Sequence, residues 1–500
     1  MHTLRLKLKT TESDRAELEK RFAAMCKCHN VLVKHAIKLL NRLDHDKEYQ
    51  KMKTEYARLL KKEKLSEQET VRKEELSGQM MEFRLSIGLG EHELQDYIKP
   101  WVKRNGQCLQ SQPVQKEASR VWSGVKKVLF GNGKKLHFKK NRDFSTIGGK
   151  SNKNGIRFDR EEMKVTYNGL VMPVKLPRRP KDRDYVMKSL ESKIKYCELK
   201  RLMFPNGWHY YVIIVMDDEA PKKACHPDAD KGSAGLDIGT STAAVVTDHQ
   251  VILEELAPEV KTYNRKIARL QKSMDRSKRD MNPEKFNPDG TINQANKEKW
   301  IWSASYLKKR NRMKSLYRKK AAYIKESHEK LCNILIQDNH VFYVEQMSFA
   351  GLARRAKQTK KPNGRKKRFG RSMNNRAPAS FVSILERKCR QHGGKLVRVK
   401  TKQFKASQFH HDTGEYVKDP LSKRSKVIEN HVVQRDLYSA FLLKNSNKAG
   451  TKPDIQKCRQ TFPCFIDMHD YAIETMKQNH ISKKILFRLL ESRKLTNNNL

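Results

Sequence analysis

The sequence predicts a mixed α/β protein in which an α/β domain, split by helical insertions, is accompanied by a helical lobe and a small β-barrel. Three observations lead to this fold class. Apolar residues recur at helical spacing through residues 11–130, and short strand-like segments follow through residues 131–230. Two later apolar stretches, at 232–246 and 340–345, have the length and composition of buried strands.

The composition indicates a nucleic-acid partner. Among 500 residues there are 106 Lys and Arg but only 56 Asp and Glu, which gives a formal net charge of +50. So large a surplus repels itself unless a polyanion neutralises it, although ribosomal-type and membrane-surface proteins are also basic. No apolar run approaches the roughly 18 residues of a spanning helix, and we find no apolar signal-peptide core. We therefore expect a cytoplasmic protein with no membrane contact, whose nine scattered cysteines are reduced thiols.

The N-terminal quarter predicts one strand followed by helices. Residues 3–9 alternate apolar and basic side chains, as in a strand with one wet face. From Thr11 onward apolar side chains recur every three or four residues, and further helical stretches are predicted at 48–65, 66–97 and 115–130.

Residues 131–230 predict a small β-barrel that the N-terminal strand completes. A long hairpin is expected between 192 and 216, around the turn at Asn206-Gly207. Short strands punctuated by Asn-Gly and Pro are expected before it, at 136–139, 156–158, 164–167 and 170–172.

The stretch GSAGLDIGTSTAAVVTDHQVIL, residues 232–253, predicts a meander of three short strands. The first strand ends on a carboxylate, Asp237, and Gly239 two residues later allows a phosphate to come close. Ribonuclease-H-like nucleases begin in this way, but Asp-Ile-Gly also occurs in sugar-kinase-like ATPases and in plain turns. Asp237 is therefore a candidate catalytic residue that needs support from the rest of the chain.

Two later carboxylates are further candidates. The strand at 340–345 ends on Glu345, and the C-terminal ends of such strands are where α/β folds place their chemistry. Asp436 lies at the start of an apolar helix. Each has an ordinary alternative role, because a Glu after a strand is often a surface residue and an Asp at a helix start often stabilises the helix N-terminus.

The three acids together are more informative than any one of them. A strand Asp, then a strand Glu after a long helical insertion, then a helix-start Asp is the order of a split ribonuclease-H-like active site. Three carboxylates in a basic groove can hold two Mg²⁺ ions about 3.5–4 Å apart, one activating a water and the other stabilising the leaving 3′ oxygen. Lys or His could not replace them, because hard divalent metals need anionic oxygen ligands.

Basic segments flank these candidates. Two helices rich in Lys and Arg are predicted within residues 257–337, and they form either a groove for a duplex or a solvated face on helices that pack against a sheet. The Arg and Lys clusters at 353–371 predict a mobile basic lid or a disordered nucleic-acid contact. The tail, 445–500, predicts packing helices without chemistry of their own.

Three motifs resemble those of a known family. GLDIGTS at 235–241, VFYVEQMSF at 341–349 and QRDLYSAF at 434–441 are similar to the RuvC motifs of the transposon-encoded TnpB nucleases, the ancestors of the type V CRISPR effectors. The segments LHFKKN and NGIRFD and the basic helix RKIARLQKSMDRSKRDMNP also have counterparts there. The similarity extends from about residue 120 to 445 and more loosely over the N-terminal lobe.

The resemblance implies RNA-guided cleavage of double-stranded DNA by a ribonuclease-H-like RuvC domain. Asp237, Glu345 and Asp436 would be the catalytic ligands of two Mg²⁺ ions. A guide RNA, either a transposon-end RNA or a crRNA, would pair with the target strand while the protein reads a short flanking motif. Such a protein would work in the prokaryotic cytoplasm and lie on the nucleoid when bound. The resemblance is compatible with a monomer and with a dimer.

The resemblance also assigns a role to each part of the chain. The assigned parts are the first strand of a wedge barrel at 1–10, a helical recognition lobe at 11–130, the wedge β-barrel at 131–230, RuvC part I at 231–256, a basic helical insertion at 257–337, RuvC part II at 338–400 with a basic loop at 350–376, a degenerate zinc-ribbon-like segment that binds target nucleic acid at 401–431, and RuvC part III with C-terminal helices at 432–500.

Two departures from the family pattern stand out. TnpB proteins usually carry a zinc ribbon of two CxxC pairs, but residues 406–431 contain no cysteine. His410, His411 and His431 could form a residual site, yet histidines without thiolates are more often loop residues, so we expect no structural zinc. Tyr438 stands where many relatives have Asn. The three acids are intact, which argues against a nuclease-dead regulator.

The leading hypothesis is therefore an RNA-guided, Mg²⁺-dependent DNA endonuclease. A compact type V CRISPR effector using a crRNA is an alternative of the same class. An RNA-guided DNA-binding repressor without cleavage, a general nucleic-acid chaperone and a strand-transfer transposase are alternatives of other classes. The intact acids speak against the repressor, and a chaperone needs no buried strands that end on acids.

Overall fold

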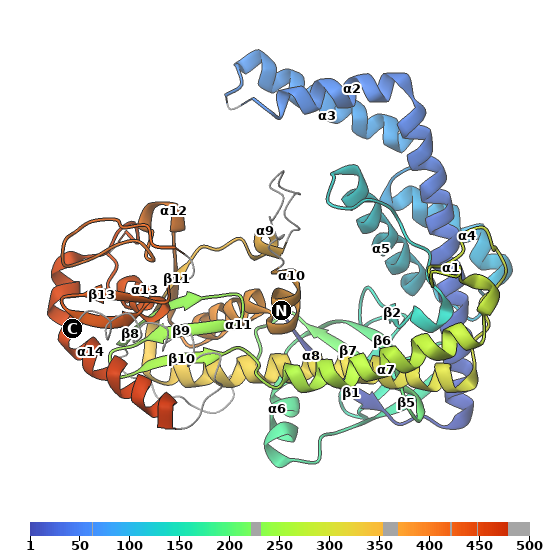
Figure 1. Ribbon diagram of the computed structural model, residues 1–500. Coiled ribbons are helices and arrows are strands. Elements are labelled where there is room, and N and C mark those ends of the chain that lie inside the picture. Colours follow the sequence, from blue (N-terminus) through green and yellow to red (C-terminus); the bar gives the residue numbers. More distant parts are fainter. Residues whose placement is uncertain (63, 222–231, 354–368, 421–422, 448, 479–500) are drawn as a thin grey trace. The chain divides into compact units, whose positions relative to one another are not determined.

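The chain folds into two compact units, Met1–Lys223 and Ala224–Leu500 (Figure 1). No helix in the part of the chain described below is both long and apolar enough to cross a membrane. The structure is a computed structural model that describes residues 1–62, 64–221, 232–353, 369–420, 423–447 and 449–478.

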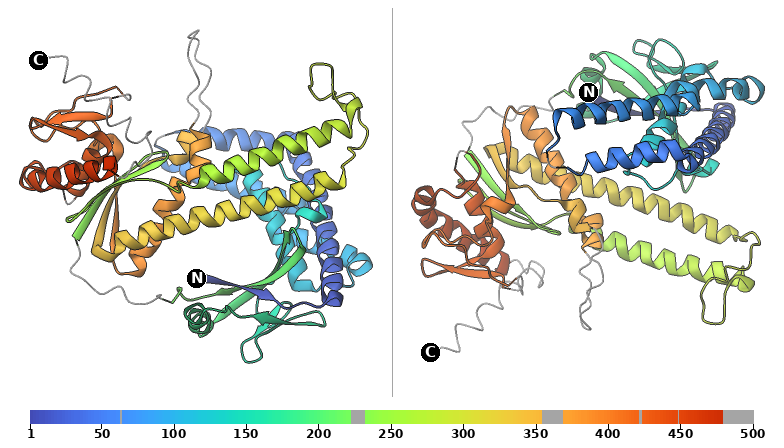
Figure 2. Two further views of the ribbon diagram at one scale, coloured as in Figure 1. Left: turned by 60° about the horizontal axis from the view of Figure 1, so that its bottom comes forward. Right: turned by 90° about the horizontal axis from the view of Figure 1, so that it is seen from above.

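The N-terminal unit contains a seven-stranded antiparallel sheet in the order β2-β6-β7-β1-β5-β4-β3, and this sheet curls (Figure 2). Strand β1 lies inside the sheet because it pairs with β7 on one side and with β5 on the other. The strands are β1 (His2–Leu8), β2 (Thr146–Gly148), β3 (Arg157–Asp159), β4 (Lys164–Tyr167), β5 (Leu170–Lys175), β6 (Ile194–Phe204) and β7 (Gly207–Met216).

Helices form the rest of this unit and share one hydrophobic core with the sheet. Capping boxes at Thr11 and Ser66 fix the starts of α1 and α3, because each hydroxyl accepts a backbone N–H that the helix leaves unpaired. The helices are α1 (Glu12–His45), α2 (Lys47–Leu59), α3 (Glu67–Ser86), α4 (Glu91–Asn105), α5 (Ser111–Leu129), the short η1 (Asn141–Asp143) and α6 (Pro180–Leu190).

Two sequence predictions for this unit were wrong, and one helix of the unit was not predicted. Residues 136–139 form no strand, because the backbone of Lys139 is hydrogen-bonded on both sides to the Asn30 side chain of α1, at 2.8 and 2.9 Å. The predicted helical stretch 66–97 is two helices, α3 and α4, separated by a turn in which Gly88 has a φ of +84°. Helix α6 was not predicted, although Pro180 at its first turn is a typical start signal.

The C-terminal unit is built on a five-stranded sheet in the order β10-β9-β8-β11-β12. The first three strands form the predicted antiparallel meander. Strand β11 runs parallel to both of its neighbours, as expected from its unbroken apolar sequence. The strands are β8 (Gly232–Ile238), β9 (Thr242–Val246), β10 (Val251–Glu255), β11 (Asn339–Glu345) and β12 (Lys395–Val399).

Helices cover both faces of this sheet (Figure 1). One hydrophobic core joins the sheet to α13 and α14, and another joins its opposite face to α8 and α11. The remaining elements of the unit are α7 (Val260–Asp280), η2 (Pro283–Lys285), α8 (Ala304–Asp338), α9 (Phe349–Ala353), α10 (Gly370–Arg376), α11 (Pro378–Gln391), α12 (Thr401–Phe404), β13 (Ser425–Ile428), β14 (His431–Gln434), α13 (Arg435–Lys444) and α14 (Ile455–Gln478).

Strand β8 shows why α13 packs where it does. Ala234, Leu236 and Ile238 point into the core with α8 and α11, so the alternate residues, including Gly235 and Asp237, face α13. A Cβ on Gly235 would lie 2.0 Å from the Ala440 carbonyl oxygen and 2.4 Å from the Lys444 nitrogen. The helix backbone therefore lies directly on the strand, and only glycine allows this.

We expect Gly235→Ala to lower the free energy of unfolding by about 2–3 kcal/mol or more, because the obstructing atoms belong to the helix backbone and cannot rotate away. Scanning calorimetry and urea unfolding measure the change. Gly78→Ala is the matched control, because a Cβ there meets no atom within 4 Å. It should stabilise α3 by about 0.5–1 kcal/mol. Equal effects of the two substitutions would contradict the close approach of α13.

Candidate active site

Two of the three predicted acids lie at the ends of neighbouring parallel strands. The register pairs Leu236 of β8 with Val344 of β11, so the next residues along the strands are Asp237 and Glu345. Phe342 and Val344 belong to the core with α8 and α11, which places Glu345 on the opposite face, the one that α13 covers. Asp237 and Glu345 therefore share one edge and one face of the sheet.

The third acid, Asp436, lies in the first turn of α13. It is not the residue that caps this helix, because the Gln434 side chain accepts the Leu437 N–H at 2.6 Å. The Asp436 carboxylate instead lies 3.3 Å from Arg435 and 3.9 Å from Arg424. These two arginines were not predicted from the sequence, although Arg435 directly precedes the acid.

The electrostatics show that the three acids are close to one another. Burial is the largest cause that raises the pKa of Asp237 well above its usual value, followed by the charges of Asp436 and Glu345. Arg435 and Arg424 act in the opposite direction on the same pKa. Burial also raises the pKa of Glu345, so this residue is not an ordinary solvated surface acid. A small part of Asp237 is accessible to solvent, but the protein atoms packed around its carboxylate remove most of its hydration.

The donor set suits a hard divalent cation, but the side chains are not arranged as a finished metal site. Among the described residues, no group of three His, Cys, Asp or Glu side chains has such an arrangement. Asp436 is instead paired with Arg424 and Arg435. The fit rests on the backbone, which brings three carboxylates from separate segments to one place.

A turn and a short helix support the strand that carries Asp237. The Gly239 N–H is bonded to the Thr242 carbonyl at 2.9 Å, which closes the turn after β8. Ser372 of α10 donates to the Thr240 carbonyl at 2.9 Å. Most of the predicted basic lid, residues 354–368, lies outside the described residues, as do residues 479–500 of the predicted tail.

The segment that resembles a zinc ribbon is ordered by hydrogen bonds. Backbone bonds of 2.9 Å from His410 to Glu415 and from Gly414 to His410 close a tight turn, and Gly414 has a φ of +76° there. Strands β13 and β14 then form a two-stranded sheet. These hydrogen bonds fix the turn, and no cysteine occurs within residues 406–431.

Two of its histidines already have partners at their ring nitrogens. The fully buried Lys426 side chain places Nζ 3.2 Å from His410 Nε2. His411 is buried, with Nδ1 2.9 Å from the Tyr438 hydroxyl and Nε2 3.3 Å from a Glu429 carboxylate oxygen. A zinc ion at these histidines would lie beside the buried Lys426 ammonium and would find no cysteine thiolate in residues 406–431, so the residues present do not fit zinc at His410 and His411.

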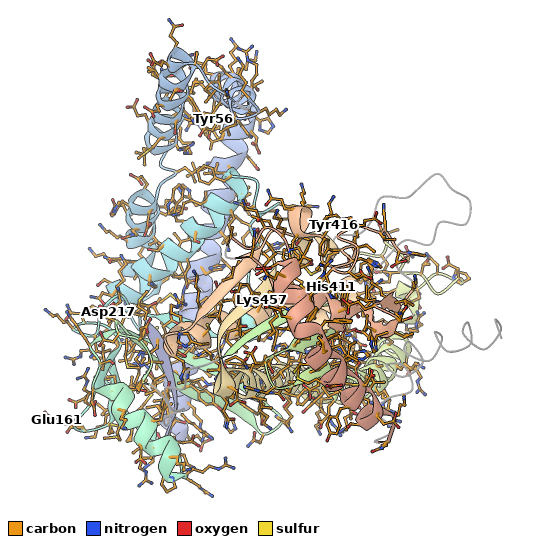
Figure 3. The ribbon with its side chains drawn as sticks, turned by 90° about the vertical axis from the view of Figure 1, so that its left-hand side faces the viewer. Tyr56, Glu161, Asp217, His411, Tyr416 and Lys457 are labelled. Atoms are coloured by element: carbon orange, nitrogen blue, oxygen red, sulfur yellow. The ribbon has the colours of Figure 1, made fainter. Side chains whose placement is uncertain are left out.

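Tyr438 links this segment to the helix that carries Asp436. Its hydroxyl accepts the backbone N–H of His411 at 3.1 Å, and both residues are fully buried. His411 lies beside the C-terminal helices (Figure 3), and its ring centroid is 4.7 Å from that of Phe462 in α14. The residue that departs from the family pattern is thus the one that anchors the zinc-free segment.

Comparisons with known proteins add only distant likenesses. No family model matches the sequence, and no curated protein matches it. Among solved structures, a Cas12f1-sgRNA-target DNA complex is similar at 12% identity and a TM-score of 0.44, over 90% of this chain and 99% of that chain. A CRISPR-Cas12f ternary complex is similar at 12% identity and a TM-score of 0.26, over 87% and 82%.

The raised pKa of Asp237 predicts a stability cost at neutral pH. The folded protein retains this proton at pH values where the unfolded chain has released it, so stability falls as the pH rises from about 3.9 through the folded-state pKa. In EDTA at pH 7, Asp237→Asn should therefore be more stable than wild type. The size of the gain measures the pKa difference between the folded and unfolded states, because one unit of that difference is worth about 1.4 kcal/mol. The gain should shrink as the pH is lowered, and urea unfolding at several pH values measures it.

Asp248→Asn is the control substitution, because its expected effect on stability at pH 7 has the opposite sign. Partial burial tends to raise the pKa of Asp248, but bonds from Lys444 Nζ and the Ser233 N–H, at 2.7 and 2.8 Å, bring it below its usual value. This substitution should destabilise the protein at pH 7. An Asp237→Asn variant that loses stability in the same way would contradict the assigned electrostatics.

We expect Tyr438→Phe to destabilise the C-terminal unit by about 1–3 kcal/mol, because the buried His411 N–H would lose its partner. Urea unfolding measures this, and hydrogen exchange should show faster exchange across residues 406–417. Tyr416→Phe is the control, since Tyr416 is 45% exposed and a surface change usually costs less than about 0.5 kcal/mol. Similar losses in both variants would refute a special role for Tyr438.

Proposed function

We propose that the chain is a TnpB-like RNA-guided DNA endonuclease that cleaves phosphodiester bonds at a single RuvC site. The observation that supports this most is the meeting of Asp237, Glu345 and Asp436, from three separate segments, at one edge and one face of the five-stranded sheet. A carboxylate at the end of a buried parallel strand lies where α/β folds carry out their chemistry. Two such strands side by side, with a third acid above them, favour catalysis over three unrelated roles.

The topology supports a ribonuclease-H-like sheet. A meander of three antiparallel strands is followed by two parallel strands that long helical connections add at the β8 edge. The helices on the two faces come from different parts of the chain, as expected when insertions split the domain. In this proposal residues 231–256, 338–400 and 432–500 form the RuvC domain.

In this proposal Asp237, Glu345 and Asp436 hold two Mg²⁺ ions, which when bound activate a water and stabilise the leaving oxygen. Even without a metal ion, neighbouring groups affect the electrostatics of these acids. Burial and the two neighbouring acids raise the pKa of Asp237 well above its usual value, because they disfavour its charged form. Arg424 and Arg435 hold the Asp436 carboxylate beside the other two acids. A Mg²⁺ ion held by these residues would favour the charged form of Asp237, and the two arginines would compete with it for the Asp436 carboxylate.

The proposed partners are a guide RNA and a double-stranded target DNA with a short flanking motif. The formal charge of +50 supports this, because a protein that holds an RNA and a DNA contacts many phosphates. We propose that residues 1–10 and 131–230 form the wedge domain and that residues 11–130 form the recognition lobe. A transposon-end RNA and a crRNA are the two possible guides.

The test begins with protein purified from cells that carry its native locus. The RNA that copurifies is sequenced, and the complex is incubated with a plasmid library matched to that RNA, in Mg²⁺ or in EDTA. We expect one defined RNA and linear plasmid only in Mg²⁺. Asp237→Asn, Glu345→Gln and Asp436→Asn should each lower cleavage by at least roughly 100-fold, because even outer-shell partners of a metal contribute about 10- to 100-fold.

Glu474→Gln is the matched control, because this carboxylate of α14 is 56% exposed and pairs with Lys477 one turn away on the same helix. It should cleave as well as wild type. Full cleavage by Asp237→Asn would refute the proposed site. A defined RNA with target binding but no cleavage would favour the repressor, and heterogeneous RNA without target preference would leave only a basic nucleic-acid-binding protein.

A further inference from the structure

The connection between α7 and α8 carries a stack of aromatic rings. The Trp302 ring lies between two others, with centroids 5.9 Å from Trp300 and 4.4 Å from Tyr306 and planes inclined by 20° and 25°. Phe286 meets Trp300 edge to face at 5.8 Å. The connection between α7 and α8, which carries these rings, lies at the tip of the long hairpin that the two helices form, at the end of α8 away from the sheet (Figure 2). The 35 residues of α8 rise by about 52 Å, so this tip is remote from the carboxylates.

These rings are not part of a hydrophobic core. None of the four belongs to the hydrophobic clusters that the described residues form, and all four remain partly exposed. Two aliphatic neighbours, Ile292 and Ile301, are 48% and 58% exposed. Aromatic side chains usually contribute to folding by being buried, so a surface stack of this size indicates a binding role.

Cations lie against the faces of these rings. Lys278 Nζ is 4.2 Å from the centroid of Trp300, and Arg279 is 4.6 Å from that of Phe286. The helices that flank the stack add further positive charge at Arg276, Lys308 and Lys309. Aromatic faces interleaved with Lys and Arg are the combination that binds single-stranded nucleic acid, since the rings stack on bases and the cations contact phosphates.

The loop that carries the stack is fixed by its own hydrogen bonds. The buried Lys285 donates to Asn296 Oδ1 at 2.8 Å and to the Glu298 carbonyl at 2.7 Å. The buried Asn282 accepts the Ile301 N–H at 2.7 Å and donates to the carbonyl of the same residue at 2.9 Å. The rings are therefore held in place before any ligand arrives, which reduces the entropic cost of binding.

We propose that the Trp300–Trp302–Tyr306 stack is a binding site for an unpaired nucleotide, whose base continues the stack while Lys278 and Arg279 contact the adjoining phosphates. The site requires nucleic-acid binding but not cleavage, so it is independent of the proposed catalytic residues. The same chemistry serves an unpaired stretch of RNA and a DNA strand displaced from its duplex.

The experiment uses the full-length protein and short single-stranded RNA and DNA that carry 2-aminopurine, a base whose fluorescence falls when it stacks on an aromatic ring. A blunt duplex of the same sequence is the third probe. Wild type should quench the fluorescence of a single strand. Trp302→Leu removes the middle ring, which holds the two outer rings in one stack, so it should restore the fluorescence and weaken single-strand binding by about tenfold. The salt dependence of binding should stay the same, because the phosphate contacts are kept.

Two control variants separate stacking from loop folding. Trp302→Phe keeps a ring and should stay within about twofold of wild type, and so should Ile301→Ala, which removes an exposed neighbour outside the stack. Stronger binding of RNA would identify an RNA strand as the occupant, stronger binding of DNA a displaced DNA strand, and equal binding a site that accepts either. Unquenched probes in wild type, binding of duplex alone, or equal losses in Trp302→Leu and Ile301→Ala would overturn the proposal.

Discussion

The direct contact between the α13 backbone and strand β8 at Gly235 is the constraint on which the candidate site depends. Asp436 precedes Ala440 by one helical turn, about 6 Å, and Asp237 follows Gly235 by two strand residues, about 6.6 Å. The helix runs opposite to the strand, since Lys444 reaches Asp248, which in turn binds the Ser233 N–H at the start of β8. Asp436 and Asp237 are therefore displaced by nearly the same distance, and in the same direction, from the contact at Gly235. Asp436 consequently lies over the end of β8, the strand that carries Asp237.

The same geometry explains the electrostatics. Placing three acids at one edge is unfavourable, and burial makes the cost larger because water no longer screens the charges. The chain limits the cost locally, with Arg424 and Arg435 beside Asp436, and not through its general positive charge. Exposed lysines elsewhere contribute little at this distance, because salt screens surface charges beyond about 8–10 Å. Repulsion among the three buried acids and the two arginines beside them therefore set the electrostatic cost of this edge of the sheet.

Local sequence patterns predict the parts of the fold that depend on nearby residues. The meander of β8, β9 and β10, the buried strand β11 and the places of the three acids all follow from periodicity and from turn residues. The patterns fail where a partner lies far along the chain. Residues 136–139 look like a strand, but Asn30 binds their backbone from 109 positions away. Gly235 cannot be recognised as a contact point without knowing that α13, some two hundred residues later, lies on it. Arg424 approaches Asp436 only because β13 and β14 fold back on each other.

The absence of cysteines from residues 406–431 changes how that segment depends on the rest of the unit. A zinc ribbon is held by four bonds within itself, so it can stay ordered when its neighbours move. Here the corresponding contacts include the buried bond from His411 to Tyr438, and Tyr438 lies two residues after Asp436 on α13. The fold of residues 406–417 therefore depends on the position of α13 on β8. The conformation of residues 406–417 and the placement of Asp436 are two consequences of the same helix position, which couples them.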